Sequence, residues 1–203
     1  MHAKALRHLR HADPVLGAVI ARVGPCPLRP HDEGTHFNYV VRSIVYQQLS
    51  GKAAATIYAR VLGLYGGAPP TPAQLVRTAD AKLRAAGLST RKAEYVKDLA
   101  ARVHSRSIAI ERLHEMTDDE VIETLVSVRG IGRWTAQMVL MFRLGRPDVF
   151  PELDLGVQKG VQQLLGLRRL PTPEKMTKIG ERWAPFRTIA AWYLWRLLEL
   201  EAE

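Results

Sequence analysis

Residues Leu125–Asp154 read LVSVRGIGRWTAQMVLMFRLGRPDVFPELD. The pattern predicts a helix that breaks at Gly130-Ile131-Gly132 and a second helix directly after the break. Two glycines around one aliphatic residue let the backbone turn sharply and leave its N–H groups uncovered. At the start of a helix, such groups favour an anion such as phosphate. An ordinary helix-to-helix turn explains the same glycines, so the pattern alone leaves both interpretations open.

Sequence signals on both sides of this turn agree with two helices. Thr117 followed by Glu120 is a capping box, and Ile122, Leu125 and Val126 then supply an apolar stripe. The apolar residues of the second helix are Ala136, Val139, Leu140 and Phe142.

The remaining segments also favour helices. Asp13-Pro14, Ser50, Thr71-Pro72, Ser89 and Thr172-Pro173 are typical helix starts. Together with the apolar pattern, they predict helices over about residues 13–23, 35–47, 50–64, 89–103, 154–165 and 187–199, with short ones after Thr71 and Thr172. No alternating strand pattern, fixed repeat or low-complexity linker is found, so the fold class is all-α.

Composition limits the class of partner. The chain has 203 residues, of which 47% are hydrophobic, enough for one or two small cores. Its 29 basic and 20 acidic side chains give a net charge of +9, which favours a polyanion such as nucleic acid or, alternatively, an anionic membrane surface. No apolar run reaches the ~18 residues of a spanning helix, and the N-terminus does not resemble a signal peptide, so we expect a cytoplasmic protein without a membrane partner. A single cysteine, Cys26, excludes an intrachain disulfide and a four-cysteine metal site.

The stretch resembles the signature of the helix-hairpin-helix (HhH-GPD) DNA glycosylase superfamily. Gly130-Ile131-Gly132 match its hairpin, Gly145-Arg146-Pro147-Asp148 its Gly/Pro-rich loop, and Asp154 its catalytic carboxylate. Further stretches, in family order, resemble the 3-methyladenine DNA glycosylase II branch: Asp13-Pro14-Val15-Leu16, Gly24-Pro25-Cys26, Gln47-Gln48-Leu49-Ser50, Gly87-Leu88-Ser89 and Trp183-Ala184-Pro185-Phe186-Arg187.

The resemblance implies two helical subdomains with a DNA-binding cleft between them. The central subdomain would hold about residues 35–145, including the hairpin at 117–142, and residues 1–34 and 146–203 would form the other. The implied activity is that of a monomeric, monofunctional glycosylase, which hydrolyses the N-glycosidic bond of alkylated purines in double-stranded DNA. It would be associated with the nucleoid if the source is bacterial. No cofactor is required, although carbonyls of Val128 and Gly130 are candidates to hold a structural monovalent cation, with no side-chain metal ligands.

Asp154 has two interpretations. It lies where a helix cap belongs, and capping alone explains it. The resemblance makes it the carboxylate that stabilises positive charge on the sugar as the bond breaks. The usual family pattern has Pro-Val-Asp or Asp-Asp here, whereas this chain has Glu152-Leu153-Asp154, which leaves Glu152 and Asp148 as substitutes.

Four side chains are candidates to contact the damaged base. Trp134 lies where bifunctional relatives have a lysine nucleophile, so it either packs the hairpin or stacks on an extruded base. Trp195 belongs to an apolar final helix, where core packing and a role as a second pocket aromatic are both open. Tyr46 and Met138 complete the candidate substrate-binding set.

The candidate DNA contacts lie in two loops. The corner between two helices, Gln47 to Ser50, resembles the family element that fills the gap left by a flipped nucleotide, with Gln48 or Leu49 as the wedge; an exposed interhelical corner is the alternative. The hairpin candidates are Val128, Gly130, Ile131, Gly132, Arg133 and Thr135.

Two other functions remain open at this stage. One is a non-catalytic module that binds damaged DNA, and the other is a glycosylase for a neutral base such as mismatched adenine or uracil. A neutral leaving group would need a proton donor in the pocket.

Overall fold

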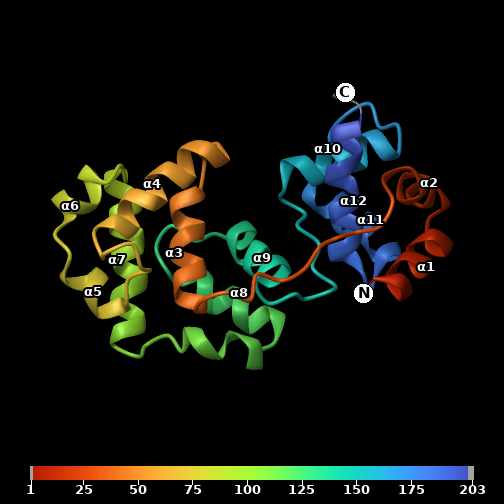
Figure 1. Cartoon of the computed structure of the whole chain (residues 1–203). Coiled ribbons are helices and arrows are strands. Elements are labelled where there is room, and N and C mark those ends of the chain that lie inside the picture. Colours follow the sequence, from red (N-terminus) through yellow and green to blue (C-terminus); the bar gives the residue numbers. More distant parts are fainter. Residues whose placement is uncertain (1, 201–203) are drawn as a thin grey trace. The chain divides into compact units, whose positions relative to one another are not determined.

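The computed structural model describes residues 2–200, and these residues form helices and connecting loops with no strand (Figure 1). Backbone contacts divide the chain into two units, one of residues 1–31 with 140–203 and the other of residues 32–139. The predicted limits of the central subdomain are 35 and 145, whereas this division falls at Asp32 and, within a helix, at Val139. The all-α prediction is confirmed.

The central unit is built around one long helix. Its elements are α3 (His36–Tyr46), α4 (Gly51–Gly63), α5 (Pro72–Arg77), α6 (Asp80–Ala85), α7 (Thr90–His104), η1 (Ile110–Glu115), α8 (Asp118–Val126) and the start of α9 (Arg133–Phe142). Helix α7 packs against α3, α5 and α6, and Figure 1 shows it among them. Its buried face carries Ala93, Val96, Leu99 and Ala100, at the spacing of one helical stripe.

The other unit joins the two ends of the chain. Its elements are α1 (Ala3–Ala12), α2 (Pro14–Val23), α10 (Leu155–Leu164), α11 (Pro173–Gly180), η2 (Glu181–Trp183) and α12 (Arg187–Leu200). Helix α12 packs against α10 and α2, which confirms that the predicted first helix joins the C-terminal helices.

Asp13 ties these ends together. Its Oδ1 accepts from the N–H groups of Val15 and Leu16, which caps α2 as predicted. Its Oδ2 accepts a hydrogen bond of 3.0 Å from Nε1 of Trp183. Trp183 is fully buried and lies 170 positions further along the chain. Because a buried carboxylate needs such partners, Asp13 and Trp183 fix the core of this unit.

Tyr193 joins α12 to the end of α2. Burial raises the pKa of Tyr193 to about 12, and its protonated hydroxyl donates to the Gly24 carbonyl at 2.7 Å.

One predicted stripe is wrong in detail. Val126 is 44% exposed, and the buried residues of α8 are Val121 and Leu125. Residues four apart lie on the same face of a helix, whereas Val126 is rotated by about 100° from Leu125. The capping box of Thr117 and Glu120 at the start of α8 is confirmed.

Candidate functional site

The corner between α3 and α4 presents two exposed side chains. Gln48 has a φ of +56°, which lies in the left-handed region. Residues other than Gly adopt this backbone conformation at a cost of about 1 kcal/mol. Gln48 and Leu49 are exposed, Leu49 by 40%, and Ser50 caps α4 through its hydroxyl. Strained residues of this kind cluster at functional sites, so the conformation agrees with the predicted role of this corner.

Gln47 points the other way, into the protein. Its Nε2 donates to the Gly130 carbonyl at 3.0 Å and to the Thr135 hydroxyl at 3.3 Å. Thr135 is only 6% exposed. The side chains of Gln47 and Thr135 therefore join the corner to the hairpin. For Thr135, the backbone rather than the side chain is the candidate for contact with DNA.

The two hairpin glycines differ in what they require. Gly130 has a φ of +76°, and a Cβ there would lie 2.1 Å from the Tyr95 ring. Gly132 has open space around its Cβ position. Between them, Ile131 is 4% exposed and packs inward, as Val128 does at 1%. These two side chains anchor the turn in the core, so only their backbone is a candidate for phosphate.

Helix α9 begins directly after this turn. Arg133 and Trp134 lie in its first turn and are exposed, Trp134 by 40%, while Gly132 accepts the helical hydrogen bond from Ala136. The N–H groups of a first helical turn, with the positive end of the helix dipole, attract phosphate. Trp134 is too exposed to be a core residue of the hairpin.

Tyr46 and Met138 are both half-buried. The Arg42 guanidinium carbon lies 4.1 Å from the centroid of the Tyr46 ring, and the Tyr58 ring lies edge-on at 6.3 Å. Met138 follows Trp134 by four positions, so the two share one face of α9. Their contact with a base stays a prediction.

Asp154 caps α10 and also contacts an aromatic ring. Its Oδ1 accepts from the Val157 N–H at 2.7 Å, which confirms the capping role. The same oxygen accepts from Nε1 of Trp195 at 2.9 Å. Capping and catalysis are compatible, because the half-buried carboxylate uses Oδ1 for the Val157 N–H and Trp195 Nε1 while it remains at the start of α10.

Trp195 is half-buried rather than a core residue. Its ring stacks on Phe142, with centroids 5.9 Å apart and an interplanar angle of 28°. Beside it, a Cβ on Gly156 would lie 2.9 Å from Trp195 Cδ1 and Nε1, and 3.1 Å from Asp154 Oδ1. Gly156 and Phe142 thus support this pair, and sequence reasoning missed both roles. The sequence does contain a signal for Gly156. It is a glycine in the first turn of a predicted helix, where the backbone conformation does not require glycine.

The two substitute carboxylates differ from Asp154. Asp148 forms a two-pronged ion pair with Arg187, from Nε to Oδ1 and from Nη2 to Oδ2, both at 2.8 Å, and it also accepts from the Arg187 N–H. Both oxygens of Asp148 are therefore engaged by one guanidinium. Glu152 is half-buried, and its carbonyl accepts from Nε2 of Gln158. Asp154 is distinguished by its hydrogen bond to Trp195, a candidate base-binding aromatic.

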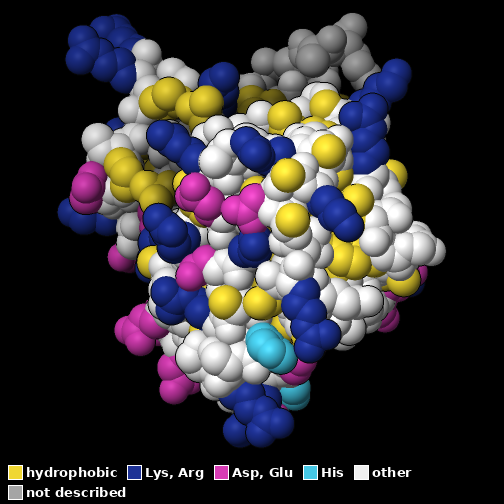
Figure 2. All heavy atoms as spheres, turned by 90° about the vertical axis from the view of Figure 1, so that its left-hand side faces the viewer, with side chains coloured by type: hydrophobic (Ala, Val, Ile, Leu, Met, Phe, Trp, Pro, Cys, Tyr) yellow, Lys and Arg dark blue, Asp and Glu magenta, His cyan; other side chains and the backbone are white. Residues whose placement is uncertain are grey.

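Positive charge does not mark one patch on the face that Figure 2 draws. Lys and Arg side chains there are dispersed among Asp and Glu. Charge on this face therefore does not identify a DNA-binding surface, and the hairpin and the corner remain the candidates. Within residues 2–200, no helix is long and apolar enough to cross a membrane. No group of three or more His, Cys, Asp or Glu in this range is arranged to hold a metal ion.

Comparisons with known proteins agree with this geometry. The chain is 37% identical over 201 residues to DNA-3-methyladenine glycosylase 1 of Schizosaccharomyces pombe, covering 97% of this chain and 88% of the relative. A structure of the 3-methyladenine DNA glycosylase of that yeast in complex with abasic DNA superposes with a TM-score of 0.86 at 36% identity, covering 96% of both chains. A DNA-3-methyladenine glycosidase from Bacillus halodurans superposes with a TM-score of 0.84 at 38% identity, covering 98% of this chain and 96% of that one. The family model for the HhH-GPD superfamily of base excision DNA repair proteins matches residues 41–186. The chain belongs to this superfamily.

Proposed function

We propose that this protein is a monofunctional DNA glycosylase that removes alkylated purines, 3-methyladenine and 7-methylguanine, from double-stranded DNA. The observation that carries the proposal is the pair of Asp154 and Trp195, joined by a hydrogen bond of 2.9 Å at the start of α10. The names of the relatives, which are 3-methyladenine glycosylases, support the choice of substrate.

The chemistry fits a carboxylate beside an aromatic ring. In hydrolysis the bond between the base nitrogen and the sugar carbon breaks, and its electron pair leaves with the base. The oxygen of a water molecule then bonds to the sugar carbon, and this water releases a proton to solvent. An alkylated purine already carries positive charge, so it departs as a neutral base without a strong general acid. Asp154 stabilises the cation that develops on the sugar.

Trp195 has a second use in this scheme. The face of an indole attracts a cationic ring by about 0.5–2 kcal/mol. The Trp195 indole donates a hydrogen bond from Nε1 to Asp154, and one of its faces lies against Phe142. These two contacts fix its orientation. Trp134, on α9, is the second aromatic candidate, with 40% of its surface exposed.

DNA contact is assigned to the backbone of the hairpin and to the corner at Gln48 and Leu49. The hairpin positions the duplex through phosphate without reading sequence. The carbonyl of Val128 accepts from the Ile131 N–H, and the carbonyl of Gly130 accepts from Gln47 Nε2. A carbonyl has two lone pairs, so a monovalent cation fits there beside a phosphate, as a structural aid only. A monomeric protein of the cytoplasm completes the proposal.

Glycosylase assays on duplexes that each carry one defined lesion test this function. We expect release of 3-methyladenine and 7-methylguanine, and little release of mismatched adenine or uracil. Binding to these duplexes without release of any base would contradict the proposal and indicate a non-catalytic module. Preferential release of a neutral base would replace it with the other alternative.

A further inference from the structure

We propose that three residues of α7, Lys92, Tyr95 and Asp98, position both DNA-contacting loops of the central unit. We call them the α7 support row. They follow one another at intervals of three positions, so neighbouring members are adjacent on the helix surface and the row winds partly around α7 over about 9 Å. The inference rests on the proposed function for its biological meaning, but the contacts themselves belong to the free protein.

Lys92 holds the corner. Its Nζ donates to the carbonyl of Val45 at 2.7 Å and to that of Gln47 at 2.6 Å. Two carbonyls at the end of α3 are thereby joined to α7, directly before the strained Gln48. Burial lowers the pKa of Lys92, which agrees with partial removal of its ammonium group from water.

The space behind the corner explains why these bonds matter. A pocket of about 230 Å³ lies there, and its lining includes Leu49, Ile57, Leu88 and Lys92. Side-chain packing therefore supports the corner incompletely. The two hydrogen bonds from the ammonium replace the contacts that packed side chains would otherwise make.

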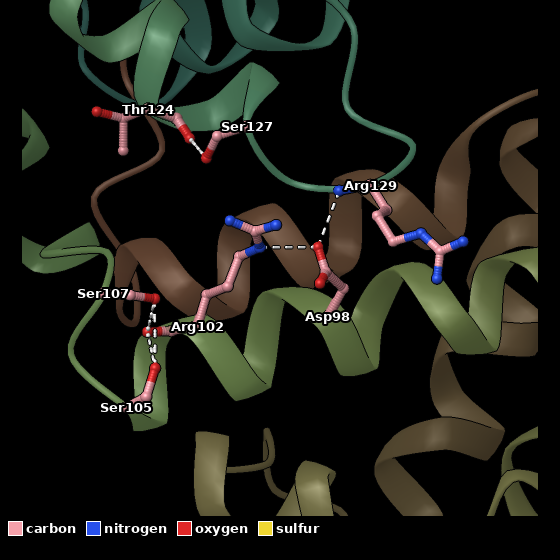
Figure 3. Close-up of polar contacts among 7 residues, drawn as sticks. All are labelled: Asp98, Arg102, Ser105, Ser107, Thr124, Ser127 and Arg129. Atoms are coloured by element: carbon pink, nitrogen blue, oxygen red, sulfur yellow. Dashed lines mark hydrogen bonds and ion pairs between the residues drawn. The ribbon is translucent and has the colours of Figure 1, made fainter.

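Tyr95 and Asp98 hold the hairpin. The ring of Tyr95 lies so close to Gly130 that a Cβ there would be 2.1 Å from it. Asp98 Oδ2 accepts from the Arg129 N–H at 2.9 Å and from Nε of Arg102 at 3.0 Å, and Figure 3 shows its carboxylate between these two residues. The side chain of Asp98 is 21% exposed, so water screens this charge only in part.

Gln47 closes the arrangement. Its carbonyl accepts from Lys92, and its side chain donates to the carbonyl of Gly130, whose Cβ position is occupied by the Tyr95 ring. The corner, the hairpin and α7 are thus linked in a ring of contacts. A wedge and a phosphate anchor act on the same duplex, so a fixed separation between them prepares the protein for extrusion before DNA binds.

Lys92→Met tests the row, with Lys97→Met as the matched control. Both changes remove one ammonium from α7, but Lys97 pairs with the exposed Asp80 and not with the corner. By hydrogen exchange of the free protein, we expect faster exchange in residues 45–50 of Lys92→Met and in residues 127–133 of Asp98→Ala. Faster exchange throughout the central unit, or none in these segments, would overturn the proposal.

Excision assays supply the functional measurement. Lys92→Met is expected to lose roughly tenfold or more on a firmly paired lesion, since small misplacements of a positioned group cost that much, and to lose little on a lesion in single-stranded DNA. Combined with Gln48→Ala, its loss should be less than the product of the two single losses. Equal losses on both substrates, or multiplicative losses in the pair, would contradict a positioning role. If wild type and Lys97→Met excise no alkylated purine, the proposed function fails, while hydrogen exchange still decides the support row.

Discussion

Gly156 is the residue at which a single methyl group has the clearest predicted effect. Gly156→Ala places a Cβ 2.9 Å from the Trp195 ring and 3.1 Å from Asp154 Oδ1. We expect excision to fall roughly 10- to 100-fold, because the indole and the carboxylate must separate. Helix stability should not suffer, since Ala favours a helix over Gly. Single-turnover excision measures the effect, with Gly63→Ala, at an open position, as the control. Wild-type excision by Gly156→Ala would exclude the proposed arrangement.

The hairpin glycines call for different substitutions. Gly132→Val adds bulk at an open position with no positive φ, so it should weaken binding to all duplexes alike by blocking approach to the backbone. The slope of the logarithm of the binding constant against the logarithm of the salt concentration should become shallower by about one, which corresponds to one lost phosphate contact. Gly130→Val is unsuitable, because its side chain would overlap the Tyr95 ring and disturb the fold. A change in base preference with unchanged affinity would show that the hairpin is not a phosphate anchor.

At the scale of the element, the corner between α3 and α4 should act on extrusion rather than on bond cleavage. Extruding a paired base costs a few kcal/mol, and a side chain that fills the gap recovers part of it. Replacing Gln48 and Leu49 with Ala should therefore reduce excision most where the lesion is firmly paired. In single strands or opposite a mismatch the loss should be smallest. A comparison of excision rates across these substrates is the measurement, and uniform losses would indicate a purely structural corner.

The helices that sequence predicts are those with a local start signal. Thr71, Ser89, Thr117 and Thr172 each cap a helix through a side chain, and a cap is encoded within four residues. Sequence analysis assigned no helix to α1, α6, η1 or η2. These elements begin at His2, Ala79, Ala109 and Gly180, none of which makes a side-chain cap hydrogen bond. Tertiary packing stabilises them instead, which sequence periodicity alone does not reveal.

At the scale of the whole molecule, the candidate site depends on pairs of residues that are distant in sequence. Gln47 meets Gly130, Lys92 meets Val45, and Trp195 meets Asp154. The resemblance supplied the identity of Asp154 and Trp195, but it could not supply their hydrogen bond or the supporting Gly156. Such contacts follow from how helices pack, and no local pattern encodes them. The contacts of α7 with the corner and the hairpin likewise depend on how the helices pack.

The protein should leave an intact abasic strand after removing the base. An imine requires an amine, and the family resemblance places Trp134, which has none, where bifunctional members have a lysine. Borohydride added during turnover should therefore trap no covalent protein–DNA adduct. A bifunctional glycosylase on the same DNA serves as the positive control. Efficient trapping would contradict monofunctional hydrolysis and point to a lysine elsewhere.

Excision by Asp154→Asn tests the central claim most directly. An Asn keeps an oxygen that can accept from Val157 N–H and Trp195 Nε1, and it caps a helix about as well as Asp, so folding and lesion binding should change little. Only the negative charge is lost. Single-turnover excision of 3-methyladenine and 7-methylguanine should fall by roughly two to three orders of magnitude, as losing about 3–4 kcal/mol of transition-state stabilisation implies. The loss should be smaller for 7-methylguanine than for any neutral base, whose departure needs more help. A folded Asp154→Asn protein that binds lesion DNA and excises at the wild-type rate would remove Asp154 from the mechanism and make Glu152 the next candidate.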